Sequence, residues 1–132
     1  MATDETRYVS YLEAVFIHFE LMRLMGETRY GVDDRTLIES ALARPRHAAV
    51  YENADLIRQA ATLCFGLIKN HPWMGGNTRT ATTIMREFLR FNHYRLQATP
   101  ADTLALALAV EADRWKLDEI EIWLRERAAP LL

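Results

Sequence analysis

The chain has a single cysteine, Cys64. One thiol excludes a disulfide framework and any zinc site built from several cysteines, and it is typical of a protein of the reducing cytosol. Cys64 lies on the apolar face of a predicted helix, where a structural thiol is far more common than a nucleophile. We therefore expect Cys64 to be buried and to have no catalytic role.

Neither sign of charge dominates the sequence. The 16 lysines and arginines balance 18 acidic residues, which gives a formal net charge of −2 and a pI of about 6.1. This balance provides no general attraction to nucleic acid or to an anionic membrane surface. We therefore expect neither direct nucleic-acid binding nor membrane binding.

The sequence also lacks an apolar run of membrane-spanning length, an N-terminal leader of basic then apolar residues, internal repeats and linkers. Its 132 residues are enough for one buried core but too few for two. These features predict a single cytoplasmic domain over residues 1–132, in which residues 1–9 are polar and frayed.

Apolar residues recur at spacings of three and four along most of the chain, and this periodicity predicts helices. No stretch has a convincing strand pattern, so the expected fold is an all-α, compact single-domain bundle of about six helices. Capping residues and prolines set the expected boundaries. The expected helices cover residues 10–26, 33–45, 53–70, 77–92, 99–114 and 118–130.

Two of these helices carry further expectations. In the first, we expect His18 to be a partly exposed surface residue, because it lies off the apolar stripe that should pack inward. That stripe consists of Leu12, Val15, Phe16, Phe19 and Met22, followed by Arg23. The third helix is apolar around most of its circumference and should be central, and Gly66 within it predicts close packing of another helix at that point.

The segment between the third and fourth helices, residues 70–81, contains a proline and two adjacent glycines. These residues cannot continue a helix, so one helix stops, a tight loop follows and another helix begins. The first N–H groups of the new helix have no partner within it and attract an anion. The segment therefore predicts a phosphate-binding loop, with His71 on one side and Arg79 on the other.

These residue types suit the transfer of a phosphorus-containing group. His71 would take a proton from an attacking hydroxyl, as a histidine base does in many enzymes. Gly75, Gly76 and the N–H groups that follow them would hold phosphate oxygens. Arg79 would neutralise charge that grows in the transition state, and Asn77 would orient the loop.

A structural role for the same residues is equally consistent with their spacing. Asn77 would then cap the helix, Arg79 would pair with an acid, and His71 would hydrogen-bond a backbone carbonyl. The sequence has neither a Walker loop nor a His-Glu-x-x-His zinc motif, so no general-purpose motif decides between the two interpretations.

The letters of residues 71–81, HPWMGGNTRTA, resemble the signature of the Fic/Doc superfamily, which reads roughly His-Pro-Phe-x-(Asp/Glu)-(Gly/Ala)-Asn-(Lys/Gly)-Arg. Residues 37–45 and 88–96 resemble the corresponding regions of death-on-curing (Doc) proteins. Thr82 stands where Fic enzymes usually carry a second arginine. The resemblance is therefore to the Doc branch, and it covers most of the chain.

This resemblance implies a helical fold that binds ATP or another nucleoside triphosphate at the loop. It also implies transfer of phosphate, or less often of a nucleotide monophosphate, to a protein hydroxyl. Doc-type toxins modify elongation factor Tu and arrest translation, and a small antitoxin protein holds each toxin inactive. By position, His71 would be the catalytic base and Arg79 a catalytic phosphate ligand. The other nucleotide contacts would come from Lys69, Gly75, Gly76, Asn77 and Thr78.

Two positions depart from the Doc pattern. Gly75 replaces the acid that holds Mg²⁺, and Thr78 replaces a phosphate-binding lysine, so no residue of the loop is expected to bind a metal. Lys69 could supply the missing cation, and Glu52 or Asp55 could reach a metal from elsewhere. The departures leave an alternative open, a catalytically weakened relative that still binds an antitoxin or another protein. An unrelated helical interaction domain is disfavoured, since a basic recognition helix for nucleic acid is missing.

Overall fold

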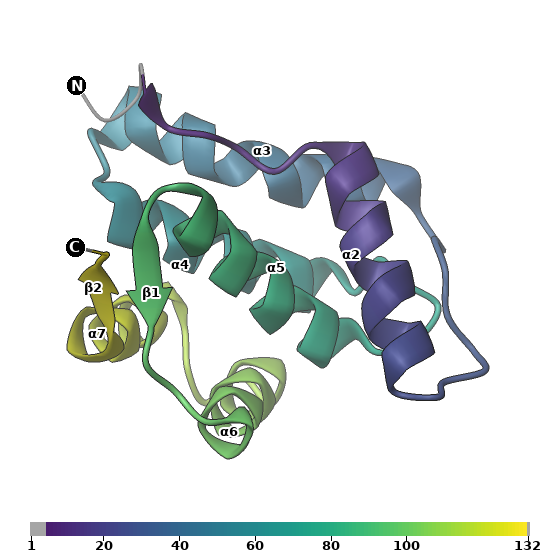
Figure 1. The fold of residues 1–132 in the computed structure, drawn as a ribbon. Helices are drawn as coiled ribbons and strands as arrows, with labels where there is room; N and C mark the ends of the chain where they lie inside the picture. Colours follow the sequence, from purple (N-terminus) through teal and green to yellow (C-terminus); the bar gives the residue numbers. More distant parts are fainter. Residues whose placement is uncertain (1–4, 132) are drawn as a thin grey trace.

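Six helices and one small sheet make up the part of the chain that the computed structural model describes, residues 5–131 (Figure 1). The all-α class and the number of helices agree with the prediction, and the sheet is an addition to it. The elements are α2 (Tyr11–Leu24), α3 (Arg35–Glu52), α4 (Leu56–Asn70), α5 (Asn77–Phe91), β1 (Tyr94–Leu96), α6 (Pro100–Glu111), α7 (Leu117–Arg127) and β2 (Ala128–Pro130).

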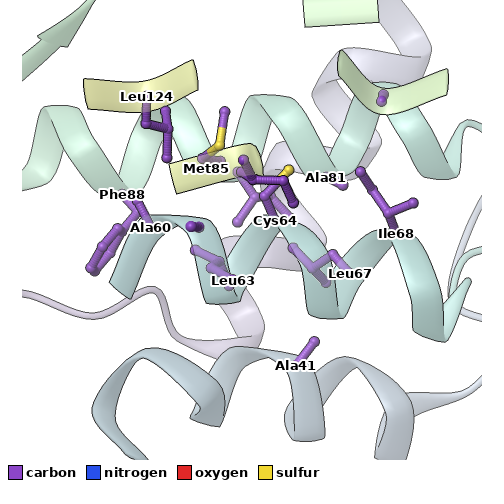
Figure 2. Close-up of a cluster of buried hydrophobic side chains, with 14 of the residues drawn as sticks. Ala41, Ala60, Leu63, Cys64, Leu67, Ile68, Ala81, Met85, Phe88 and Leu124 are labelled. Atoms are coloured by element: carbon purple, nitrogen blue, oxygen red, sulfur yellow. The ribbon is translucent and has the colours of Figure 1, made fainter. Parts of the chain in front are cut away.

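Helix α4 is the centre of the fold. It contacts α3, α5, α6 and α7, and ten of its 15 residues are buried, as predicted for a helix apolar around most of its circumference. Figure 2 shows Cys64 within the apolar cluster around this helix. Burial raises the pKa of the Cys64 thiol to about 12, so the thiolate that a nucleophile needs is absent at neutral pH. The prediction of a buried, structural thiol is confirmed.

Helix α3 crosses α4 closely at Gly66. A Cβ at this position would lie 2.7 Å from Cδ of Arg44 and 3.3 Å from Cβ of Ala41. Both of these residues are on α3, so the expected close approach of another helix at Gly66 is confirmed. The missing side chain lets the two backbones pack together, which offsets the cost of a glycine inside a helix.

The prediction that α3 ends at Pro45 is wrong. The helix continues to Glu52 and ends at Asn53, whose left-handed conformation has a φ of 55°. A proline inside a helix removes one backbone hydrogen bond. Ala48 and Ala49, in the turn that follows, are buried against the core. We infer that this burial outweighs the lost bond, since most helix stability in proteins comes from packing.

The prediction for the packed face of α2 is right for Met22, which is buried, and for Val15, which packs against the core, but wrong for the other apolar residues of the stripe. The helix starts as expected at Ser10, which forms a capping box with Glu13. Its buried residues, however, are Ala14, His18 and Met22. Leu12, Phe16 and Phe19, which the periodicity placed inside, are 76%, 66% and 43% exposed. The helix therefore buries a small, a polar and a flexible side chain against the rest of the fold and leaves an apolar face uncovered.

The two-stranded sheet was not predicted. β1 pairs with β2 in an antiparallel register that aligns Tyr94 with Pro130 and Leu96 with Ala128. Both strands have three residues, and Pro130 is tolerated because the sheet has only one ladder. Three residues are too few to show a period-2 pattern, which explains why the sequence did not reveal the pair.

The N-terminal residues pack more firmly than expected. The prediction of fraying over residues 1–4 lies outside the described part of the chain, and over residues 5–9 it is wrong. The N–H of Arg7 donates to Oδ1 of Asn92, at 2.8 Å, and the Tyr8 hydroxyl donates to Gln59, at 2.9 Å. Val9 is buried. These contacts attach the segment before α2 to α4 and to the end of α5.

The last two helices begin close to their predicted positions. Thr99 and Asp102 form the capping box of α6, with Pro100 in its first turn. Helix α6 ends at Glu111, three residues earlier than expected, and α7 begins at Leu117. Within residues 5–131, no helix combines the length and the apolar composition needed to cross a membrane.

Candidate active site

The loop between α4 and α5 has the predicted arrangement of a helix end, a tight turn and a helix start. His71 ends α4 in a left-handed conformation with a φ of 51°, and Gly76 precedes α5 with a φ of 66°. A Cβ at Gly76 would lie 2.5 Å from the sulfur of the buried Met22. The left-handed backbone therefore favours glycine at this position, and a Cβ here would also force the Met22 side chain to move.

Asn77 holds this loop in shape. Its Oδ1 accepts a hydrogen bond from the N–H of Trp73, and its Nδ2 donates to the carbonyl oxygen of Trp73, both at 2.9 Å. Asn77 is 6% exposed, so water does not compete for these bonds. Gly76, not Asn77, occupies the N-cap position of α5. The capping role is not found, and the side chain makes the contacts expected of a residue that orients the loop.

His71 lies at the surface beside the start of α5. Its side chain is 60% exposed, so the ring can reach a hydroxyl brought by another molecule. Nδ1 lies 3.3 Å from Nδ2 of Asn77, and Nε2 lies 3.7 Å from Oε2 of Glu111, at the end of α6. In the described part of the chain, the ring makes no hydrogen bond to a backbone carbonyl, the partner that the structural alternative required.

In the part of the chain that the structure describes, neither Arg79 nor the N-terminus of α5 has an anionic partner. No side chain caps this helix end, and the first backbone N–H groups of a helix have no acceptor within it. Among residues 5–131, Arg79 has no ion pair, and its recorded contact is from Nη1 to the sulfur of Met25, at 3.3 Å. An unpaired guanidinium next to an uncapped helix end favours the binding of an anion.

A cavity of about 670 Å³ lies against this end of α5. Thr78 and Arg79 line it from α5, Leu21 from α2 and Leu104 from α6. Its volume falls within the range of small-molecule sites. Its wall combines a cation with apolar side chains, an arrangement that suits a ligand with one anionic and one aromatic part.

Lys69 is placed differently from the other predicted site residues. Its Nζ donates to Asp113, which follows α6, so its charge already has a partner. Lysine and aspartate are both at the surface, and such a pair can exchange partners when an anion arrives. The role of Lys69 as a replacement for the missing lysine at Thr78 stays a prediction.

His18 is part of the site's framework, although the sequence placed it at the surface. The ring is fully buried and stacks on Trp73, with centroids 4.2 Å apart. Its Nε2 accepts from the N–H of Gly31, at 3.0 Å, so the ring proton is on Nδ1, which donates to Oγ1 of Thr80, at 2.8 Å. One imidazole thus joins α2, the loop, α5 and the segment of residues 27–34. The exposed assignment was wrong because the periodicity selected the wrong face of α2.

Lowering the pH from 7 to 5 should weaken the fold through His18. Burial lowers the pKa of His18 to about 4 from an ordinary value of 6.5, so between these values the unfolded chain binds a proton that the folded chain does not. Stability that is present above pH 6.5 is therefore lost as the pH falls toward 4, by about 2 kcal/mol at pH 5.

Urea unfolding of the protein and of His18→Gln at both pH values measures this loss. The variant should lose about 2 kcal/mol less between pH 7 and pH 5 than the unaltered protein, since glutamine does not titrate. The same pH dependence in both proteins would contradict the role given to His18.

Residues 27–34, between α2 and α3, lie along the loop as a short strap. The N–H groups of Asp33 and Asp34 donate to the carbonyl oxygen of Pro72, at 3.0 and 3.1 Å, and the N–H of Met74 donates to the carbonyl oxygen of Gly31, at 2.9 Å. A Cβ at Gly75 would overlap the backbone carbonyl oxygen of Arg29. The strap therefore fits against the loop only because residue 75 is glycine.

The comparison with protein families agrees with this geometry. The sequence model of the Fic/DOC family matches residues 8–89, more than half of the chain and the whole of the loop. The chain belongs to the Fic/DOC family. A comparison with curated proteins found no match. Helices α6 and α7, and with them Glu111, lie beyond the part of this Fic/DOC chain that the family model covers.

The Fic/DOC signature implies a magnesium ion held by an acid at the position of Gly75, and the residues present do not fit one there. Gly75 offers no side-chain oxygen, and the carbonyl oxygen of Arg29 occupies the space where a side chain would begin. Within residues 5–131, no group of three or more histidine, cysteine, aspartate or glutamate side chains is placed to share a metal. Glu52 ends α3 and Asp55 caps the start of α4, at the opposite end of α4 from the loop, and Asp55 accepts a hydrogen bond from Arg125.

Gly75→Ala should destabilise this Fic/DOC chain by about 1–3 kcal/mol, because the added methyl group pushes the strap off the loop. The same clash means that Gly75→Asp cannot restore the family's acid without moving Arg29. Thermal or urea unfolding measures the loss. The matched control is Gly26→Ala, since a Cβ at Gly26 meets nothing within 4 Å and only the φ of 69° opposes it. Equal losses in the two variants would contradict the fit between strap and loop.

Proposed function

We propose that this Fic/DOC chain is a Doc-like transferase that moves phosphate from a nucleoside triphosphate, such as ATP, to a hydroxyl of a protein. The observation that carries the proposal is the contact of 3.3 Å between His71 and Asn77, which places a histidine ring at the uncapped N-terminus of α5. A base beside an anion-binding helix end is the arrangement that transfer to a hydroxyl needs. Transfer of a nucleotide monophosphate is the less favoured form of the same reaction.

The donor's phosphates would lie at the start of α5. The N–H of Gly76 and the first N–H groups of the helix would donate hydrogen bonds to phosphate oxygens, and Thr78 would add a hydroxyl donor. Arg79 would neutralise the charge that increases as the phosphoryl group transfers. The cavity of about 670 Å³ next to Arg79 would hold the nucleoside against its apolar wall of Leu21 and Leu104.

The chemistry proposed for these residues is a single displacement at phosphorus. The hydroxyl gives its proton to His71 while its oxygen attacks the terminal phosphorus, and the bond from that phosphorus to the leaving nucleoside diphosphate breaks. Asn77 keeps the loop and His71 in register through its bonds to Trp73. The backbone N–H groups and Arg79 stabilise the charge on the transferring group.

The partners of this reaction follow from the resemblance to Doc proteins. The protein substrate would be elongation factor Tu or another protein with an accessible hydroxyl, and a small antitoxin would hold the enzyme inactive. The uncovered apolar face of α2, with Leu12 and Phe16 exposed, supports a protein partner, since an amphipathic helix can cover such a face. With these partners, the chain would be the toxin of a toxin–antitoxin pair that acts in the cytoplasm.

A second candidate function is a catalytically weakened relative that binds its partner but transfers nothing. The observation that favours it is the place of Gly75 against Arg29, which leaves no room for the family's acid. Thr78 also removes a positive charge from a site that acts mainly through electrostatics. In this case the fold and the exposed face of α2 would serve for binding alone.

Induced expression in bacteria separates the two functions. The transferase should arrest growth, and His71→Ala should relieve the arrest at equal protein levels. Normal growth during expression of the unaltered protein would contradict the toxin role. If Thr78→Lys alone then causes arrest, the weakened relative is the correct description, because one restored cation would have recovered the activity.

A further inference from the structure

The orientation of the Asn77 amide is determined by the backbone of Trp73. The amide oxygen must face the Trp73 N–H and the amide nitrogen must face the Trp73 carbonyl. In the reverse orientation, the NH₂ group would face the N–H, a donor against a donor, and the amide oxygen would face the carbonyl, an acceptor against an acceptor. The group that lies 3.3 Å from Nδ1 of His71 is therefore an NH₂ group, a donor. Nδ1 of His71 must carry a lone pair, and the proton of the neutral ring is on Nε2.

The second ring nitrogen faces a carboxylate. Nε2 of His71 lies 3.7 Å from Oε2 of Glu111, which is the last residue of α6. Within residues 5–131, Glu111 has no other ion pair. The distance is longer than a hydrogen bond, but apo sites often tighten when substrate binds. A hydrogen bond between His71 and Glu111 needs a proton on Nε2 and an acceptor that faces it, and this arrangement supplies both.

We propose that Glu111 is the positioning residue of His71, and that Nδ1 is the nitrogen that takes the substrate's proton. The inference rests on the function proposed above and assigns a residue that lies beyond the range of the family match. Glu111 would hold the ring with its lone pair toward Asn77 and the start of α5, the place given to the donor's phosphates. A base that a third group orients is a recurrent arrangement in nucleophilic catalysis.

The proton balance of the step is simple. The hydroxyl displaces the Asn77 amide from Nδ1, because a hydrogen bond of 3.3 Å is a weak one. The O–H bond breaks as its proton moves to Nδ1, and the oxygen's electron pair forms the new bond to phosphorus. The leaving nucleoside diphosphate takes the electron pair of the bond that breaks. The imidazolium keeps its second proton on Nε2, where the Glu111 carboxylate stabilises the positive charge.

Glu111→Gln tests the role of the carboxylate, since it keeps the size of the side chain and removes its charge. The transfer rate at saturating nucleotide should fall roughly three- to tenfold, a modest loss because the pair is half-exposed and screened by water. The KM for the nucleotide and the unfolding temperature should not change. Glu39→Gln is the matched control, since Glu39 is 51% exposed against 45% for Glu111 and pairs with Arg35 on α3. Equal rates in the two variants would overturn the proposal.

Nuclear magnetic resonance of histidine-labelled protein tests the geometry without any transfer assay. Long-range proton–nitrogen correlations should show the neutral ring of His71 as a single tautomer with its proton on Nε2, and His71→Ala identifies the signals by their loss. A proton on Nδ1 would overturn the proposal. If the unaltered protein transfers nothing, the proposed function fails while this measurement still decides the orientation of the ring.

Discussion

Replacing His71 with alanine should lower the rate of phosphate transfer by about 10²–10⁴-fold while the protein stays folded. The His71 side chain is 60% exposed, so its loss removes the base without opening the core. His71 already has a left-handed φ of 51°, and alanine keeps a Cβ in the same backbone conformation, so the substitution adds little strain. A transfer assay with labelled nucleotide measures the rate, and circular dichroism measures the fold.

Two further variants separate lost chemistry from lost stability. His71→Asn should lose the same activity with less strain, since asparagine tolerates the left-handed conformation. His47→Ala, which removes an exposed histidine of α3, should keep the full rate. A His71→Asn protein that transfers as fast as the His47→Ala protein would contradict the role of His71 as the base.

Replacing Asn77 with alanine should have the largest combined effect on stability and activity. The change leaves the buried N–H and carbonyl groups of Trp73 without partners, and each such group costs about 1–3 kcal/mol. We therefore expect the free energy of unfolding to fall by roughly 2–4 kcal/mol. The transfer rate should fall as well, because the loop no longer holds His71 and the start of α5 in register.

Asn70→Ala is the matched control for this variant. Asn70 is the residue before His71, and its amide makes one hydrogen bond, to the carbonyl oxygen of Leu37, at 2.9 Å. Its removal should cost about 1 kcal/mol and leave the rate close to that of the unaltered protein. Urea unfolding and the transfer assay compare the two variants. Equal losses of stability would contradict the view that Asn77 holds the loop closed.

The helix ends were predictable from sequence because local chemistry determines them. Ser10 and Thr99 cap their helices through a side chain and an acid three residues later, and both motifs are found as predicted. At Pro45, by contrast, the local signal is misleading. It predicts a helix end, but Ala48 and Ala49 are buried, and burial depends on the tertiary packing and not on the residues next to the proline.

The prediction of which face of α2 packs inward failed for a related reason. Hydrophobicity alone selected Leu12 and Phe16, which are exposed, and rejected His18, which is buried. The polar ring is buried because Gly31 and Thr80 satisfy both of its nitrogens. Neither partner is near His18 in sequence, so no pattern within α2 could have revealed the match.

Part of the candidate site could likewise be predicted from local sequence, and part could not. His71, Asn77 and Arg79 lie within one turn-rich segment, and the prediction that Asn77 orients the loop agrees with its contacts to Trp73. Glu111 reaches the loop only through the fold, since 40 positions of chain separate it from His71. The contact between Gly75 and Arg29 involves a backbone oxygen, which no sequence pattern identifies.

Gly75 changes what the family resemblance implies for this chain. The strap of residues 27–34 occupies the space that an acid at residue 75 would need. The same glycine therefore explains both why the strap can pack here and why the family's metal-binding acid is absent. Anion binding then depends on the start of α5 and on Arg79, neither of which requires an acid at residue 75. Under the proposed function, His71 would be the base and the start of α5 the anion site, in a loop that the strap of residues 27–34 covers.

The most direct test of this account is a search for the transferred group. Pure protein is incubated with bacterial lysate, magnesium and labelled nucleoside triphosphates, and intact-mass and peptide mass spectrometry then compare each lysate protein with a sample that contains His71→Ala. The account predicts that one protein gains a phosphate at a hydroxyl side chain, only with the unaltered enzyme. A gained nucleotide monophosphate would support the less favoured form of the transfer. No mass added to any protein would contradict the proposed transferase activity.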